Sequence, residues 1–431
     1  MLDEQGVEYL DTRNNVAHVG HGHPRVVHAV QQQVAALNTN TRYLHPNVSL
    51  LAKRLVERLD DPLKIVFFVN SGSEANDLAL RLARAYTKSK NTIVVDGAYH
   101  GHTLATLDIS PYKYEHSKEF TLQAQPASEF STPHHHIFKV PSPDTFRGKH
   151  RSIATAATDY SQYVKDACDY YIQTRNESVG AFVIEGGMSV AGVILPPKGY
   201  LKQCVDAVRS AGGVYIADEV QTGFGRLGSC QWAFQYNNQL NQERVVPDIV
   251  TVGKPFGNGM PLGAVVTTPE VARAFEDMGV EYFNTFGGNP VCAAAGLAML
   301  DVLDDESLQS HALKVGNYLK DRFRALRDDD GVYLIGDIRG SGLFLGIELV
   351  KDQASLEPAT VETSFLCTTL KEEHRVLTSI DGFDDNVLVV KPPLVFSEED
   401  AEHFIECFKH AFSDLVSIGE EGLRSISKTP T

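Results

Sequence analysis

The sequence has few of the features that nucleic-acid-binding or membrane proteins need. Its 39 lysines and arginines are outnumbered by 55 aspartates and glutamates, which gives a formal net charge of −16. A surface that binds a phosphate backbone requires clustered basic side chains, and the acidic balance argues against one. No apolar run is long enough to span a bilayer. We therefore expect neither nucleic acid nor membrane as a partner, whereas a small basic pocket remains compatible with an acidic chain.

Cysteine is also scarce, with six residues scattered along the chain and no CxxC or other metal-ligand spacing. This pattern predicts free thiols in a reducing compartment and no metal site. The start of the chain, Met1 to Gly6, lacks the basic and apolar regions of a signal peptide. We expect a cytoplasmic protein, and a mitochondrial location stays open because an upstream segment absent from this sequence could carry an address.

Short apolar runs rich in β-branched residues alternate with helical patterns through the first two thirds of the chain. Such strands predict an α/β fold with a mostly parallel sheet covered on both faces. In these sheets, ligands collect at the carboxyl ends of the strands, and here polar or glycine residues follow each predicted strand. The predicted strands are Ile65–Val69, Thr92–Val95, Ala181–Ile184, Val214–Ala217 and Ile249–Val252.

At 431 residues the chain exceeds what one hydrophobic core usually fills, so we expect two domains. A large ligand-binding domain is predicted over 46–290 and a smaller α+β domain over 291–418, with residues 1–45 packing against the small domain. The polar tail 419–431 is predicted to be disordered. Residues 121–136 are interpreted as a polar surface insertion, and its histidines as a solvated run.

Lys254 and Asp218 are the most informative pair of residues. Lys254 closes the apolar strand 249–252 after a glycine, and Asp218 closes the strand 214–217. Burying an unpaired ammonium is costly, so Lys254 either extends to water or has a lowered pKa suited to Schiff-base chemistry. An amine that forms a Schiff base and an acid that faces a pyridine nitrogen are the pair that pyridoxal phosphate requires.

Two loops at the same predicted sheet edge could complete such a site. Ser71, Gly72 and Ser73 lie between a strand and a helix, where free backbone N–H groups can cradle an anion, although plain N-capping would explain the serines equally well. Tyr99, with His100 beside it, follows another strand and offers a ring for stacking, unless it is simply an exposed loop tyrosine.

Two other glycine-rich stretches are less informative alone. Gly223–Gly228 has the spacing of a dinucleotide fingerprint, but we reject that interpretation because no convincing helix follows it. Thr285 lies on the loop 283–290, where a lone threonine would normally mean only a turn.

Taken together and in this order along the chain, these residues resemble the class III pyridoxal-phosphate-dependent aminotransferases of fold type I. The resemblance runs from Gly6 to about Val416 and implies a homodimer with active sites at the subunit interface, whose pairing into tetramers stays open. It implies that Lys254 binds the cofactor aldehyde, Asp218 pairs with the pyridinium nitrogen and Gln221 reaches the ring hydroxyl. The predicted cofactor-binding residues are Ser71, Gly72, Ser73, Tyr99, His100, Glu185, Asp218, Gln221, Lys254 and, from the partner subunit, Thr285.

Within that class, four segments resemble the phospho-lyases that act on phosphoethanolamine and 5-phosphohydroxylysine: 14–21, 37–45, 109–113 and 143–149. Many aminotransferases of the class carry an arginine three residues before a pair of prolines, to bind a substrate carboxylate.

This chain has Val389 at that position, so a phosphorylated amine becomes the better candidate. Arg42, Tyr43 and Lys391 are the predicted substrate residues. The leading hypothesis is elimination of phosphate; the alternatives are an aminotransferase acting on an ω-amine or amino acid and, more remotely, a non-catalytic scaffold.

Overall fold

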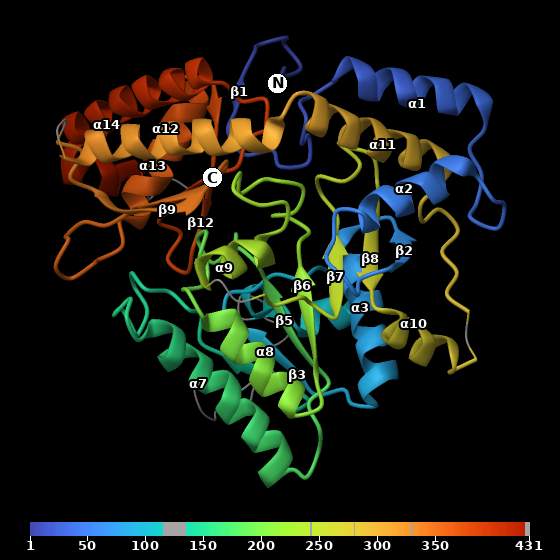
Figure 1. The fold of residues 1–431 in the computed structure, drawn as a ribbon. Helices are drawn as coiled ribbons and strands as arrows, with labels where there is room; N and C mark the ends of the chain where they lie inside the picture. The colour runs from blue at the N-terminus through green and yellow to red at the C-terminus, as the bar shows by residue number, and fades with distance from the viewer. Residues whose placement is uncertain (115–134, 242–243, 280, 329–330, 427–431) are drawn as a thin grey trace.

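The computed structural model describes residues 1–114, 135–241, 244–279, 281–328 and 331–426 (Figure 1). Most of the predicted insertion at 121–136 lies outside these residues. Within them, no helix combines the length and apolar character that a membrane crossing requires. No group of three or more His, Cys, Asp or Glu side chains in this part of the chain could hold a metal ion.

The largest of the sheets has seven strands in the order β2-β8-β7-β6-β5-β3-β4. Neighbouring strands from β7 to β4 run parallel, whereas β8 is antiparallel to both β7 and β2. The strands are β2 Ile65–Val69, β3 Thr92–Val95, β4 Ile137–Val140, β5 Ala181–Glu185, β6 Val214–Asp218, β7 Ile249–Val252 and β8 Gly263–Thr267. The prediction of a mostly parallel α/β sheet is confirmed.

All five predicted strands are present, and two strands were not predicted. β8, with the sequence Gly-Ala-Val-Val-Thr, is buried throughout and is as apolar as its neighbours. β4 is an edge strand that follows directly on the polar stretch 121–136, and only its first and last residues are buried. Its weak apolar pattern reflects this edge position, because one side of the strand has no neighbour to pack against.

Helices cover both faces of the sheet because the strand side chains alternate between them. In β3, Ile93 and Val95 join the large core on the face of α7 and α8, while Val94 joins a second core with α3 and α10. The helices of this part are α1 Pro24–Ala36, α2 Pro46–Val56, α3 Gly72–Thr87, α4 Leu104–Asp108, α5 Pro111–Tyr114, α7 Ala156–Asp169, the π-helix η1 Tyr170–Thr174, α8 Tyr200–Ser210, α9 Ala233–Asn241 and α10 Pro269–Glu276.

The C-terminal part forms a second layer, with an antiparallel sheet in the order β12-β13-β10-β9. In Figure 1 this sheet and its helices gather at the end of the molecule away from α7 and α8. A short parallel pair, β1 with β11, joins the N-terminal segment to this part, and α11 packs on α1 and α2. The elements are β1 Leu10–Asp11, α11 Pro290–Asp305, α12 Leu308–Asp328, β9 Ile335–Ser341, β10 Phe344–Leu349, α13 Thr360–Glu372, β11 Val376–Leu377, β12 Ser379–Asp381, β13 Val387–Val390 and α14 Glu398–Ile426.

The expectation of a disordered tail from residue 419 is wrong for residues 420–426. α14 continues to Ile426, with a break in helical geometry only at Gly419, whose φ is 64°. Leu423 is buried after that break, so it supplies an apolar contact that keeps the chain against the domain. Residues 427–431 lie outside the described part of the chain.

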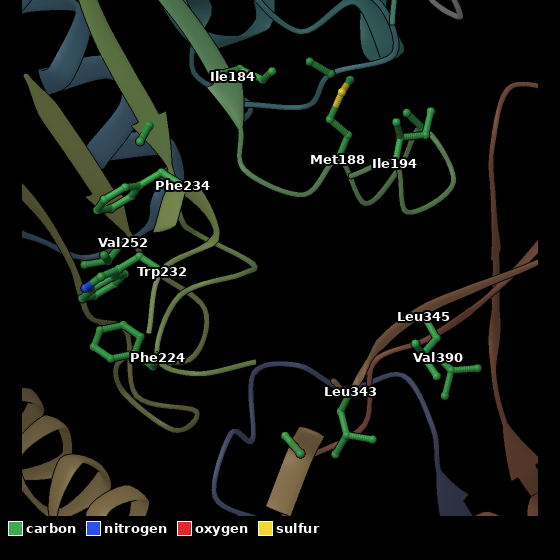
Figure 2. Packing of buried hydrophobic residues seen from close by; sticks show 14 of the residues in the cluster. Ile184, Met188, Ile194, Phe224, Trp232, Phe234, Val252, Leu343, Leu345 and Val390 are labelled. Atoms are coloured by element: carbon green, nitrogen blue, oxygen red, sulfur yellow. The ribbon is translucent and has the colours of Figure 1, made fainter. Parts of the chain in front are cut away.

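One continuous core joins the two parts. Phe224 and Trp232, whose ring centroids are 4.9 Å apart, belong to the same buried cluster as Leu343, Leu345 and Val390 of the small sheet. Figure 2 shows these residues, together with Met188 and Ile194 on the loop that follows β5. Because this apolar surface is shared, the position of the small sheet relative to the strand ends is set by packing.

His18 is buried beside this core in a neutral form. Its Nε2–H donates to the carbonyl of Phe224 at 2.8 Å, while its Nδ1 accepts from the buried guanidinium of Arg226 at 3.3 Å. Burial, reinforced by the charge of Arg226, lowers the pKa of His18 to about 3. The imidazole is therefore an acceptor for a buried cation and resists protonation.

We expect acid to destabilise the fold through His18. Its folded pKa lies below the unfolded value of about 6.5, so its contribution is complete above that pH and is lost as the pH falls toward 3. The free energy of unfolding should lose about 1.4 kcal/mol per pH unit in this window from this group. Urea unfolding at several pH values measures this free energy for the native chain and for His18→Gln. The slope of the free energy against pH should be smaller for the variant by this amount, and equal slopes for the two proteins would contradict the assignment.

Candidate cofactor site

A cavity of about 370 Å³ lies at the carboxyl ends of β5, β6 and β7. Its walls include nine of the ten predicted cofactor-binding residues; Thr285 is not among them. The nine are Ser71, Gly72, Ser73, Tyr99, His100, Glu185, Asp218, Gln221 and Lys254. Lys254 and Asp218, taken from the ends of adjacent strands, thus face one cavity.

Asp218 is buried and held by three hydrogen bonds. Its Oδ2 accepts from Nδ2 of Asn76 at 2.7 Å and from Nδ1 of His100 at 2.8 Å, and its Oδ1 accepts from the backbone N–H of Val220 at 3.0 Å. An ionised carboxylate only accepts, so His100 must present its Nδ1–H. These donors stabilise the negative charge in a setting where desolvation opposes it.

Asn76 and Thr251 are functional neighbours that sequence reasoning missed. The hydroxyl of Thr251 donates to Oδ1 of Asn76 at 2.7 Å, which leaves the Asn76 amide to reach Asp218 and the carbonyl of His100. The available signal was an asparagine on the buried face of α3, between Ala75 and Leu78. A buried polar side chain needs a hydrogen-bond partner, so an asparagine at this position predicts a buried acceptor nearby.

Lys254, directly after β7, is partly buried and lines the cavity. Burial lowers its pKa, and the negative charges of Asp218, Glu185 and Asp381 oppose that shift. A lysine with a lowered pKa has more of the neutral amine that attacks a carbonyl or accepts a proton. The prediction of a lowered pKa, instead of an amine that extends to water, agrees with this position.

The start of α3 has the geometry of an anion cradle. Ser71 is the N-cap, with its Oγ accepting from the backbone N–H of Glu74 at 3.1 Å, so the capping interpretation holds for this residue. A Cβ at Gly72 would lie 2.5 Å from Cγ1 of Val220, a cavity residue, so only glycine fits here. The remaining N–H groups of this first turn are available to an anion in the cavity.

Tyr99 and Glu185 also line the cavity. The backbone N–H of Tyr99 donates to Oε1 of Glu185 at 3.0 Å, and that of Ser189 donates to Oε2 at 3.3 Å. Burial raises the pKa of Glu185 to about 7. The ammonium of Lys113 lies 5.7 Å from the centre of the Tyr99 ring.

A cradle for an anion, a buried amine, a carboxylate with fixed orientation and an aromatic ring therefore meet in one cavity. This set of donors and acceptors fits pyridoxal phosphate, which presents a phosphate, an aldehyde and a basic ring nitrogen. Gln221 is also buried there, and its Oε1 accepts from Nδ2 of Asn15 at 2.8 Å, so the Gln221 side chain is held in place from the N-terminal segment.

Thr285, Arg42 and Tyr43 lie outside the cavity of their own chain and are exposed. The Arg42 guanidinium stacks over the ring of Phe283, 4.7 Å from its centre. Asn284, next to Thr285, donates to Oε2 of Glu74 at 2.9 Å. That bond ties the loop to the first turn of α3, where the cradle lies.

Lys391, the remaining predicted substrate residue, is buried just beyond β13. Its Nζ donates to Oγ of Ser189 at 2.8 Å and lies 3.5 Å from Oδ2 of Asp381. Its charge and that of Lys254 act on each other, although Lys391 is not among the residues that line the cavity. Ser189 gave no signal in the sequence, because it lies 202 residues from Lys391 and only the folded chain unites them. Asp381, on the β12–β13 hairpin that leads to Lys391, was also missed.

Comparison with known proteins identifies the class. The family model described as aminotransferase class-III matches residues 1–412, so the chain belongs to the class III aminotransferase family, and membership implies pyridoxal phosphate as cofactor. The chain is 46% identical over 429 residues to "Alanine--glyoxylate aminotransferase 2-like" of Drosophila melanogaster, covering 99% of this chain and 82% of that protein.

Two further relatives carry phospho-lyase names. "Ethanolamine-phosphate phospho-lyase homolog 1" of Caenorhabditis elegans is 42% identical over 408 residues, covering 92% of this chain and 83% of that protein. A phospholyase from Arthrobacter, solved in complex with phosphoethanolamine, has 36% sequence identity and a TM-score of 0.84, covering 95% of this chain and 92% of that chain. The fold is thus that of the fold type I transaminases and phospholyases.

We expect Asn76→Leu to weaken pyridoxal phosphate binding by about 10-fold to 100-fold, because a charge-assisted hydrogen bond to Asp218 is lost inside the protein. Titration of the apoprotein with the cofactor, followed by visible absorbance, gives the dissociation constant. Thr251→Ser, which keeps the hydroxyl that holds Asn76, is the matched control and should bind nearly as well as the native chain. Equal affinities of Asn76→Leu and the control for the cofactor would show that Asn76 does not contribute to cofactor binding.

Proposed function

We propose that this chain is a pyridoxal-phosphate-dependent phospho-lyase that eliminates phosphate from a phosphorylated amine, such as phosphoethanolamine or 5-phosphohydroxylysine. The products would be an aldehyde, ammonia and phosphate. The observation that carries this proposal is the exchange of a carboxylate-binding arginine for Val389, with a buried cation, Lys391, two residues further along.

The surroundings of Val389 support this choice. It packs with Val193, Phe344 and Val387 in a small apolar cluster, so a substrate carboxylate directed at this strand would lose its hydration without gaining a partner. Lys391 follows just beyond β13, and its charge and that of Lys254 act on each other. Lysine binds a phosphate as a compact point charge, without the planar geometry that arginine and carboxylate share.

Several cavity residues supply the groups that this chemistry needs. The first turn of α3, with Gly72 and Ser73, would hold the cofactor phosphate, and Tyr99 would lie against the ring. Asp218 would hold a proton at the ring nitrogen, since its carboxylate is fixed by three donors. Bound pyridoxal phosphate withdraws electrons from the carbon that carries the substrate amine, which makes a proton on that carbon acidic.

Lys254 would accept that proton, because its burial favours the neutral amine. The C–O bond on the neighbouring carbon then breaks, and phosphate leaves with the electron pair. Lys391 would stabilise the charge that develops on the leaving oxygen. Addition of one water completes the conversion of the remaining fragment to the aldehyde and ammonia.

A homodimer with shared sites is part of the proposal. Thr285, Arg42 and Tyr43 are exposed around the loop 283–289, together with Leu44, Phe283 and Phe286. Exposed apolar side chains grouped in this way suit an interface with a second copy. In that arrangement Thr285 would serve the cofactor of the partner subunit, and Arg42 and Tyr43 its substrate.

Transamination is the second candidate function, favoured by the aminotransferase name of the Drosophila relative at 46% identity. It uses the same cofactor, Lys254 and Asp218, but needs a keto acid to accept the amino group. The two reactions therefore differ in their requirement for an acceptor and in phosphate release.

Phosphate release separates the two reactions. Incubated with phosphoethanolamine or 5-phosphohydroxylysine and no keto acid, the purified holoprotein should release phosphate and ammonia in equal amounts. Lys254→Ala should reduce the rate by about 10³-fold or more, because the proton acceptor is lost. Product that appears only with pyruvate or 2-oxoglutarate would establish transamination instead.

Lys391→Met should lower kcat/KM for phosphate release by about 10²-fold to 10³-fold, since a charge that stabilises the leaving group is removed while the side-chain length is kept. Visible absorbance of the bound cofactor should be unaffected. Lys314→Met, which removes an exposed lysine paired with Glu398 on the surface, is the control. Equal activity of the two variants would contradict a role for Lys391.

A further inference from the structure

Lys391 is held by two side chains from different parts of the fold. Ser189, on the loop after β5, accepts from its Nζ at 2.8 Å, and Asp381, at the end of β12, lies 3.5 Å away. Ser189 is completely buried, and Lys391 retains only 8% of its exposure. The amine therefore has a fixed position and little access to water.

Such a position disfavours the charged form of Lys391. Burial lowers its pKa, and the positive charges of Lys254 and Arg13 lower it further, whereas Asp381 opposes both. Arg13 comes from the N-terminal segment and Lys254 from the end of β7, so cations approach the amine from two sides. Asp381 is the negative partner that offsets them, and a neutral amine could not stabilise a departing phosphate.

Asp381 has its own charged neighbours. Burial raises the pKa of Asp381, as does Asp385 on the same hairpin, while Lys391 and Arg13 oppose that shift. Its charge also acts on Lys254 and on Tyr112 from α5. The three cations Lys391, Arg13 and Lys254 therefore share this one acid.

Docking of the small sheet fixes this arrangement. The backbone N–H of Gly382 donates to the carbonyl of Val190 at 2.9 Å, and Nε of Arg339 donates to the carbonyl of Gly192 at 2.7 Å. The first bond holds the β12–β13 hairpin, with Asp381, against the turn that carries Ser189, and the second holds β9 against the same turn. The two groups that hold Lys391 are thus tied to each other through the backbone.

We propose that Asp381 is the positioning residue for Lys391: with Ser189 it keeps the amine in place and charged, and so sets the selectivity for a phosphate leaving group. This inference rests on the proposed phospho-lyase function. A phosphate dianion can pair with the charged Lys391 while Asp381 remains hydrogen-bonded behind it. An uncharged Lys391 would leave the phosphate without a partner inside the protein.

The decisive variant is Asp381→Asn, with Asp385→Asn as the matched control. The control removes the same charge from the same hairpin, at an exposed position whose positive φ of 50° suits asparagine. The measurement is kcat/KM for phosphate release from phosphoethanolamine and from 5-phosphohydroxylysine across pH 6 to 9, with the cofactor absorbance as a check of the folded holoprotein.

We expect Asp381→Asn to lose activity at lower pH than the native enzyme, because Lys391 then releases its proton more easily. The loss should appear mainly as a rise in KM of about 10-fold near pH 8.5, and should be much smaller near pH 6. The inhibition constant of inorganic phosphate should rise in parallel. Asp381→Glu, which restores the negative charge, should recover most of the native profile.

Several outcomes would overturn the inference. A pH profile of Asp381→Asn that superimposes on that of the native enzyme, or an equal shift in Asp385→Asn, would show that Asp381 does not protect the charge of Lys391. If Asp381→Asn does not fold, Ser189→Ala replaces it; an unchanged KM and phosphate inhibition constant in that variant would equally reject the assigned contacts. Native holoprotein that releases no phosphate from either amine would refute the phospho-lyase function itself, and the inference with it.

Discussion

Burial of the Asp218 carboxylate is the constraint on which the site depends. A carboxylate without water requires donors, and these come from α3 through Asn76, from the loop after β3 through His100, and from the backbone at Val220. Satisfying one acid therefore brings three segments to one point. The same convergence leaves Lys254, on the next strand, facing the cavity that the acid defines.

The proposed reaction places opposite requirements on two lysines, Lys254 and Lys391. Lys254 benefits from a lowered pKa, because its proposed role needs a neutral amine, whereas Lys391 needs its charge to bind phosphate. Both amines are desolvated: Lys391 has Ser189 and Asp381 within reach, while Asp218, Glu185 and Asp381 act on the charge of Lys254. In the proposed reaction one lysine serves as base and the other as cation.

The sequence predicted the parts of the fold whose signal is local. The five apolar strands and the helix that begins at the serine-glycine cradle follow from composition and periodicity. The close approach of Val220, which requires glycine at position 72, appears only in the folded chain. The sequence was silent where burial depends on distant partners. β4 at the sheet edge, Asn76 beneath Asp218 and the helical residues after Gly419 are of this kind, since each takes its stability from a contact far along the chain.

The sequence alone determined the chemistry at hand: one lysine and one acid after neighbouring strands, a glycine-containing cradle and Val389 in place of an arginine. These residue types can be recognised in the sequence without any knowledge of their contacts in the fold. Tertiary structure decided which of them meet, through the shared core and the docking of the small sheet on the turn 188–194. It also decided that Ser189 lies beside Lys391, because a contact across 202 residues depends on packing that no local pattern specifies.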